Sequence, residues 1–304
     1  MQQSSLAYNN AFWRNMRIQD TDASLLREGR HATDTYYLPT DFVLDFTKSL
    51  QEENLFRRLA TLAETSSESG RIIATSSDGN AEFSEDGEEI NESADTLVEF
   101  PFESYKLAAL TRIRENFMHD NAFDLKGYLR SEFSRRFGRA EENAFINGNG
   151  ENQPTGLLHE TNGAETGRTT ASPDAITFDD VIALHQSLKP KYRKRAVWLM
   201  NDDTAMQLRF LKDSSGNPLW NHSNDSIFSK QVIISPFMPS ITAGAVPIAI
   251  GDLKYYWYIQ RQNLAAKVLW ELFSKYGHIG IIATERVDGL LIRREAVKAL
   301  KMAE

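Results

Sequence analysis

The chain has 304 residues, 41% of them apolar, which is enough for one large or two modest globular domains. Its net charge of −8 argues against a main affinity for phosphate backbones, and the lack of cysteine excludes disulfides, thiolate nucleophiles and zinc–thiolate sites. No apolar run approaches the roughly 20 residues of a membrane span, and the first ten residues do not resemble a signal peptide, so we expect a soluble, unsecreted protein.

The N-terminal 38 residues differ in pattern from the rest of the chain. They mix Ser, Asn, Asp and Arg with scattered aromatics and show no sustained period of 2 or 3.6, which predicts an arm. After Pro39, Thr40 or Asp41 can cap a helix. Apolar residues then recur at helical spacing at Phe42, Val43, Phe46, Leu50, Leu55, Leu59 and Leu62. The pattern predicts a helix over about 41–63.

Residues 64–100 are strongly acidic, with eleven Asp or Glu against one basic residue, Arg71. Two β-prone runs, 71–75 and 96–100, flank the turn-forming pairs Asp78-Gly79 and Asp86-Gly87. This arrangement predicts a long protruding β-hairpin. Compact domains rarely carry so long an excursion unless an outside surface orders it, so we expect a partner, such as another copy of the chain.

The next segment contains the clearest helix of the chain. A strand is expected at 105–111, and Asp124 can then cap a helix that ends at Asn147-Gly148, about 35 Å long at 1.5 Å per residue. Its predicted apolar stripe is Leu125, Tyr128, Leu129, Phe133, Phe137, Ala140 and Ala144. Its other face alternates Arg130, Arg135, Arg136 and Arg139 with Glu132, Glu141 and Glu142, which suits solvent or a charged neighbour.

A second module begins near Thr177, which opens a predicted helix. Residues 196–200 form an apolar run typical of a buried strand, and Asn201-Asp202-Asp203 can cap the helix after it. Further strands are expected at 231–234, 246–250, 255–260, 268–273, 280–283 and 296–302. The fold class is therefore predicted to be α+β.

The sequence contains no clear metal-binding or catalytic motif, and structural roles explain its candidate residues better. The six histidines form no H-E-x-x-H pairing, and the acidic run 82–92 lacks calcium-loop spacing, so we expect no metal site. Asp202 and Asp203 are better explained as helix caps than as catalytic acids. The run 189–195 holds five basic residues and is interpreted as a solvated edge, with contact to nucleic acid or an acidic partner as the alternative. We therefore expect neither an enzyme nor a cofactor.

Several motifs resemble one known family. Residues 124–158, DLKGYLRSEFSRRFGRAEENAFINGNGENQPTGLL, are similar to the spine helix and following loop of major capsid proteins of tailed bacteriophages, the Hong Kong 97 type. Four further segments are similar to segments of the same family and occur in the same order along the chain: 39–61, 198–220, 251–262 and 286–302. The resemblance covers all but the first 38 residues.

The resemblance implies a Hong Kong 97-like capsid fold. It assigns 1–38 to the N-terminal arm, 39–63 to a helix leading to the E-loop, 64–100 to the E-loop hairpin, 101–172 and 262–304 to the peripheral domain, and 173–261 to the axial domain. The E-loop of this family lies across the neighbouring subunit.

The same resemblance implies that the chain assembles with itself. Pentamers and hexamers would form the icosahedral shell of a virion head in the bacterial host cytoplasm, around double-stranded DNA that the acidic chain contacts weakly. We also expect portal, scaffolding and decoration proteins as partners. We expect no contact with a membrane. Interface candidates are Arg71, Glu82, Asp86, Glu88, Glu89, Arg130, Arg135, Arg136, Arg139 and Glu285.

The sequence departs from the family in two respects. Some members crosslink their shells covalently. An isopeptide bond forms between an E-loop lysine and an asparagine of a neighbouring subunit, and a glutamate assists the reaction. Residues 64–100 contain no lysine and 274–280 no asparagine, although Glu285 matches the assisting carboxylate, so we predict no crosslink. Nothing before the arm resembles the scaffolding segment of some relatives, so we expect either a processed chain or a separate scaffolding protein.

Two other functions are considered. An encapsulin-like compartment shares the fold and encloses cargo enzymes, but the arm and acidic E-loop favour the virus. A carboxylate-dependent hydrolase needs an acid and a base about 5 to 10 Å apart in a cleft, and the sequence alone identifies no such pair.

Overall fold

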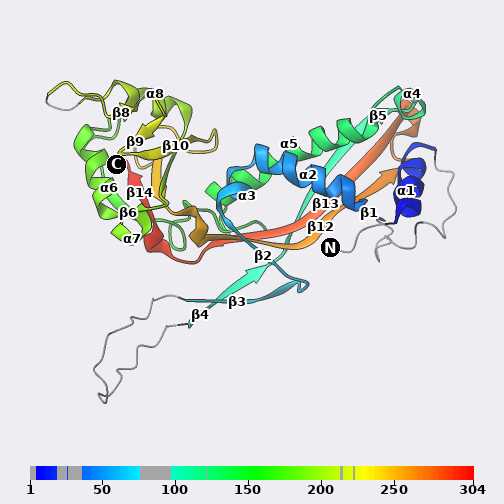
Figure 1. Cartoon of the computed structure of the whole chain (residues 1–304), viewed down its shortest axis with the longest axis horizontal. Helices are drawn as coiled ribbons and strands as arrows, with labels where there is room; N and C mark the ends of the chain where they lie inside the picture. The colour runs from blue at the N-terminus through cyan, green and yellow to red at the C-terminus, as the bar shows by residue number, and fades with distance from the viewer. Residues whose placement is uncertain are drawn as a thin grey trace, which may run out of the picture. The chain divides into compact units, whose positions relative to one another are not determined.

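The computed structural model describes residues 5–18, 26, 36–75, 97–120, 122–212, 215–221 and 223–304. The chain forms two compact units that interleave in sequence. The first comprises Met1–Ser66, Ser104–Pro154 and Tyr258–Asp288, and the second comprises Ser67–Glu103, Thr155–Trp257 and Gly289–Glu304. Both mix helices and strands, so the predicted α+β class is confirmed (Figure 1).

The first unit is a sheet of long strands covered by helices. Its strands are β1 (Tyr36–Tyr37), β2 (Thr61–Glu64), β5 (Tyr105–Arg114), β12 (Tyr256–Leu269) and β13 (His278–Leu291), in the order β1-β12-β13-β5 with β2 also pairing with β12. Its helices are α1 (Leu6–Ile18), α2 (Thr40–Glu53), α3 (Leu55–Leu59), α4 (Glu115–His119), α5 (Leu125–Asn147) and the 3-10 turn η3 (Ser274–Tyr276). β13 and β5 pair antiparallel from His278↔Arg114 to Val287↔Tyr105.

The predicted spine helix is confirmed as α5. The Asp124 side chain accepts a hydrogen bond from the Gly127 backbone N–H at 3.0 Å, and the helix ends at Asn147 before Gly148, as the capping residues indicate. Leu125, Leu129 and Phe133 lie on its buried face, in one core with α1, α2 and the sheet. α2 and α5 run side by side along the long strands (Figure 1).

The predicted helix at 41–63 is wrong in its second half. α2 ends at Glu53, and Asn54 adopts extended backbone angles (φ −128°, ψ 116°) before the short α3 begins. The Asn54 carboxamide oxygen accepts from the Phe56 N–H at 2.8 Å, which compensates an otherwise unpaired helix donor. The chain then enters β2 instead of continuing as a helix.

The expectation that residues 1–38 lack helical periodicity is wrong for residues 6–18, which form the helix α1. Tyr8, Phe12 and Met16 follow one another at four-residue spacing and are buried, and Trp13 packs on Phe42 of α2 with ring centroids 5.2 Å apart. Arg17 fixes the end of the helix by donating to the Asp120 and Phe123 carbonyls at 3.0 and 2.8 Å. The remainder of residues 1–38, apart from Ser5, Leu26, Tyr36, Tyr37 and Leu38, lies outside the described residues.

The C-terminal third contains fewer and longer strands than predicted. The strands expected at 255–260 and 268–273 are one strand, β12, which ends at Leu269. The strand expected at 280–283 extends over all of β13. Residues 289–304, expected in the domain of the spine helix, instead supply β14 (Val297–Lys301) to the sheet of the second unit, where Val297 pairs with Gly251.

The second unit is built around a seven-stranded mixed sheet, in the order β6-β14-β11-β7-β10-β9-β8. Its other elements are β6 (Glu165–Thr169), α6 (Phe178–Ser187), α7 (Pro190–Arg193), β7 (Val197–Met200), α8 (Asp202–Phe210), β8 (Trp220–Asn221), β9 (Ser226–Ile227), β10 (Lys230–Ile234), β11 (Ile248–Gly251), η2 (Leu253–Tyr255) and η4 (Arg294–Ala296). Thr177 and Asp180 form a capping box on α6. The predicted cap of α8 is confirmed, since the Asn201 side chain accepts from the Thr204 N–H at 2.8 Å.

The predicted hairpin is confirmed in its strands. β3 (Ser69–Thr75) and β4 (Leu97–Glu103) pair antiparallel from Ser69↔Glu103 to Thr75↔Leu97, as a two-stranded ribbon that joins neither sheet (Figure 1). The turn pairs Asp78-Gly79 and Asp86-Gly87 lie outside the described residues. We call the paired strands β3 and β4 the ribbon.

Candidate functional site

The spine helix carries a charged residue on its buried face. Leu125, Leu129, Phe133, Phe137 and Glu141 follow one another at four-residue spacing, so each lies next to the one before it on the helix surface, and all five are buried. Glu141 is 1% exposed and Glu142 6%. The prediction that both carboxylates lie on the exposed face is therefore wrong, and a buried carboxylate needs a partner.

The break between α2 and α3 supplies partners for both glutamates. The Asn54 side-chain N–H donates to Glu141 Oε2 at 2.9 Å, while the Leu55 backbone N–H donates to Glu142 Oε2 at 3.1 Å. Two successive carboxylates of α5 thus bind the N-terminus of α3, where exposed backbone donors favour negative charge. This turn orients Arg57 toward Glu141.

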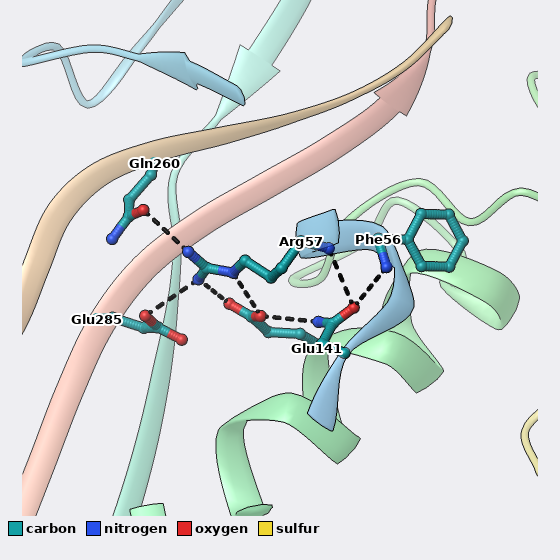
Figure 2. A network of polar contacts seen from close by, with 6 residues as sticks. Phe56, Arg57, Glu141, Gln260 and Glu285 are labelled. Carbon is teal, nitrogen blue, oxygen red and sulfur yellow. Dashed lines mark hydrogen bonds and ion pairs between the residues drawn. The ribbon is translucent and has the colours of Figure 1, made fainter. Parts of the chain in front are cut away.

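Arg57 is the centre of a buried ionic cluster (Figure 2), which we define as Arg57, Glu141, Glu285, Gln260 and Asn54. Its Nε donates to Glu141 Oε2 at 2.9 Å and its Nη2 to Glu141 Oε1. Nη2 also lies 3.3 Å from Glu285 Oε2 on β13, and Nη1 donates to Gln260 Oε1 on β12 at 3.0 Å. The guanidinium further lies 5.0 Å from the Tyr258 ring centroid. One side chain therefore connects α3, α5 and two strands.

The charges of the cluster do not balance, because two carboxylates share one guanidinium. Burial raises the pKa of Glu285 well above its ordinary value, and the like charge of Glu141 raises it further against the opposing effect of Arg57. Burial alone would lower the pKa of Arg57, but Glu141 and Glu285 outweigh it and raise the pKa. Glu285 Oε1 is buried without a hydrogen-bond partner among the described residues. These conditions favour a protonated Glu285.

Glu141 and Glu285 are two neighbouring carboxyl groups, as a hydrolase needs for its acid and base, but they are not accessible to a substrate. The side chains of Glu141 and Glu285 are 0% and 1% exposed, and that of Arg57 is 3% exposed. A substrate cannot reach groups so enclosed, and the salt bridge ties up the carboxylate that would act as base. The arrangement instead joins the spine helix to the sheet.

The predicted interface residues divide into three groups. Arg71 lies on the exposed face of the ribbon and pairs with Glu99 at 2.6 Å, whereas Glu82, Asp86, Glu88 and Glu89 lie outside the described residues. The arginines of α5 are exposed: Arg130 lies 3.9 Å from Asp45, Arg135 and Arg136 contact Glu132, and Arg139 faces solvent. Glu285 is 1% exposed and contacts its own chain, so this protomer does not present it to a neighbour.

Sequence reasoning missed Arg57, Gln260 and the buried role of Glu141. A signal for Glu141 was present, since it extends the four-residue spacing of Leu125, Leu129 and the two phenylalanines. No local pattern marks Arg57 or Gln260, because their contacts join segments 203 positions apart in sequence.

The described residues hold neither a metal-binding group nor a membrane span. Over those ranges, His, Asp and Glu side chains form no group of three suited to a metal ion. No described helix combines the length and the apolar composition of a membrane span.

Comparisons with known proteins agree on one family. Residues 34–302 match the sequence profile of the phage capsid family. A search of curated protein sequences gave no significant match. Among solved structures, the capsid of an empty GTA particle computed with C5 symmetry is similar, with 28% identity and a TM-score of 0.70 over 83% of this chain and 90% of that chain.

Structures from two phages share the fold at lower identity. Microbacterium phage Oxtober96 matches with 15% identity and a TM-score of 0.59, over 82% of this chain and 91% of that chain. Gordonia phage Cozz matches with 12% identity and a TM-score of 0.57, over 83% and 87%. The chain therefore belongs to the phage capsid family and is a shell-forming major capsid protein with the Hong Kong 97-like fold.

Proposed function

We propose that the chain assembles as pentamers and hexamers into a closed icosahedral shell, and that this shell encloses the double-stranded DNA of a tailed bacteriophage. The observation that carries the proposal is the likeness to a capsid computed with C5 symmetry, which extends over 90% of that capsid chain. Five-fold rings combined with six-fold rings are how identical subunits close an icosahedral shell.

The ribbon supports assembly through contacts between copies. Ile73 and Leu97 are 62% and 66% exposed, and their strands pair with each other and with no other strand in the described part of the chain. An isolated two-stranded ribbon is marginally stable in water, and exposed apolar side chains on it are stabilised when another surface covers them. We assign that surface to a neighbouring copy, as the E-loop position implies.

We further propose that the shell is not covalently welded and that the chain's role is structural, not catalytic. Residues 64–100 contain no lysine. The buried ionic cluster supports the same view, because Glu285 is engaged by Arg57 inside its own unit. Shell strength then comes from buried area, clasping loops or decoration proteins.

The remaining partners follow from the same proposal. The acidic chain would contact packaged DNA weakly, and portal, scaffolding and decoration proteins would complete a head assembled in the bacterial host cytoplasm. An encapsulin-like compartment is the alternative. Native particles separate the two: the virus predicts double-stranded DNA inside them, and the compartment predicts protein cargo.

Negative-stain electron microscopy of the purified chain tests the proposal directly. We expect capsomer rings or closed shells that sediment far faster than a 34.5 kDa monomer. A protein that remains monomeric over a range of concentrations, salts and crowding conditions contradicts the proposal.

A further inference from the structure

The second unit concentrates positive charge where three short elements meet. We define the basic surface as the segments that contain α7, η2 and η4, namely residues 189–195, 252–255 and 293–296. Lys189 contacts Glu295, and the Tyr192 ring packs edge-on against Tyr255 with centroids 5.1 Å apart, so the three segments lie together. Figure 1 shows α7 beside the loop that leads into β14 and contains η4.

The basic surface has the opposite charge to the rest of the chain. It holds two acidic residues, Asp252 and Glu295, and eight basic ones: Lys189, Lys191, Arg193, Lys194, Arg195, Lys254, Arg293 and Arg294. Its formal charge is therefore +6, and since the whole chain carries −8, the remainder carries −14. Solvated surfaces usually intersperse both signs, because like charges held close together repel one another. So dense an excess of one sign is typical of a surface that meets a polyanion.

Glu295 lies among the lysines of this surface. Lys189 and Lys191 both contact its carboxylate, and the buried Tyr192 donates its hydroxyl to the same group. Burial would raise the pKa of Glu295, but hydrogen bonds from Lys189, Tyr192 and Lys191 outweigh it and lower the pKa to about 2. Glu295 is therefore ionised at neutral pH. It holds both lysines in position, yet it neutralises only one of their two charges.

Other cations of the basic surface keep their full charge. Arg193 donates to two backbone carbonyls at the end of α6, both at 2.7 Å, and Arg294 Nε donates to the Gly163 carbonyl at 2.9 Å. These neutral acceptors fix the two guanidinium groups without compensating them. Lys194 and Arg195 are exposed, and neither forms a salt bridge within the described part of the chain. Exposed cations of this kind can reach an anion outside the chain.

The composition of the basic surface favours nucleic acid over an acidic protein as its partner. Large apolar side chains are exposed elsewhere among the described residues, but none of them lies in the three segments. Leu253 and Tyr192, which do lie there, are 3% and 1% exposed. A protein interface has an apolar or aromatic core and is depleted in lysine, whereas non-specific binding of DNA needs only cations that reach phosphates.

The same composition favours a duplex over a single strand. Proteins that bind single strands stack bases on exposed aromatic rings. Tyr192 is buried, and the Tyr255 ring is in contact with Tyr192 and with the Arg293 guanidinium, 5.3 Å from its centroid. The basic surface thus offers charge without a stacking platform, which suits the regularly spaced phosphates of a double helix.

We propose that the basic surface binds the phosphate backbone of the double-stranded DNA packaged in the shell. This assignment rests on the proposed function, because the enclosed genome is the polyanion. The basic surface then faces the interior of the shell, and the negative charge of the remainder confines the contact to it. Binding is independent of base sequence and falls steeply with salt, since each neutralised phosphate releases counterions.

Anisotropy of a fluorescent duplex of about 30 base pairs, titrated with dissociated subunits, tests the contact. K194Q with R195Q should weaken binding about tenfold near 0.1 M salt and should reduce the slope of log affinity against log salt by about 2. K48Q with K106Q removes the same charge from two exposed lysines of the first unit and should leave binding unchanged. K194R with R195K keeps the charge and should bind like the unmodified chain. Circular dichroism melting checks that every variant is folded.

Two results of that titration would overturn the proposal. One is an unmodified chain that does not bind the duplex, and the other is a K194Q and R195Q variant that binds as tightly as the unmodified chain. If that variant binds DNA normally but fails to assemble, the basic surface contacts a protein instead.

Acetylation of lysines in particles locates the contact. Lys194 should react in particles emptied of DNA and should be protected about fivefold or more in full ones. Equal protection in both means that a neighbouring subunit covers the basic surface, and equal reaction in both means that nothing does; either result overturns the proposal. If no particles form, the proposed function fails, whereas the duplex titration shows separately whether the basic surface binds DNA.

Discussion

Arg57 Nη2 lies 3.3 Å from Glu285 Oε2, although the two residues are 228 positions apart in sequence. The same guanidinium forms a two-point contact with Glu141 of the spine helix. The cluster thereby joins α3, the spine helix α5 and the strand β13 around one cation. It should be the most sensitive point of this unit to single substitutions.

Replacement of Arg57 by methionine should strongly destabilise the first unit. The change leaves the buried Glu141 carboxylate without its cation and Glu285 without its donor, and breaking such a buried pair costs about 3–5 kcal/mol. Denaturant unfolding of the dissociated subunit would measure the loss. R135M is the matched control, because Arg135 pairs with Glu132 on the surface and its loss should destabilise the protein far less. Equal losses in the two variants would show that the cluster contributes no more than a surface pair.

The contribution of Glu285 to the stability of the wild-type protein should fall as pH rises above about 4.5. The pKa of Glu285 is raised in the folded state, mainly by burial and then by Glu141, so the folded state retains a proton that the unfolded state releases above about pH 4.5. The stabilisation is complete at low pH and is lost as pH rises through the raised pKa. E285Q should flatten this dependence in thermal melts.

E132Q provides the control for that pH experiment. The hydrogen bond from Arg135 lowers the pKa of Glu132, with burial opposing, so its contribution changes below the ordinary pKa of glutamate and not between pH 5 and 9. An E285Q protein that keeps the wild-type slope would show that Glu285 does not retain its proton.

Asn54 should be more important than an ordinary helix cap. N54A removes the acceptor for the Phe56 N–H and the donor to buried Glu141, so we expect a loss of about 2–4 kcal/mol. N201A, which removes the cap of α8 and a hydrogen bond to Ser240, should cost about 1–2 kcal/mol. Urea titration of both variants compares them, and the reverse order would refute the role assigned to Asn54.

Much of this architecture could be predicted from local sequence. Asp124, the apolar spacing from Leu125 and the Asn147-Gly148 end were enough to place α5. The pattern that begins at Thr177 placed α6, and the Asn201 cap placed α8. The helix α1 was missed because polar neighbours obscure the spacing of Tyr8, Phe12 and Met16. The cluster was missed because burial of Glu141 depends on Arg57, which reaches it only through tertiary packing.

Denaturing electrophoresis of purified particles should show one band at the mass of the monomer. No lysine in 64–100 is present to form an isopeptide bond, and Glu285 is held inside its own protomer. A ladder of covalent multimers that resists boiling in detergent would contradict this prediction.

The most direct test of the account is electron cryomicroscopy of assembled particles at a resolution that shows side chains. We expect a closed shell in which Ile73 and Leu97 of each ribbon contact a neighbouring copy. Particles in which both side chains face solvent or pack against their own protomer, or the absence of any shell, would contradict it.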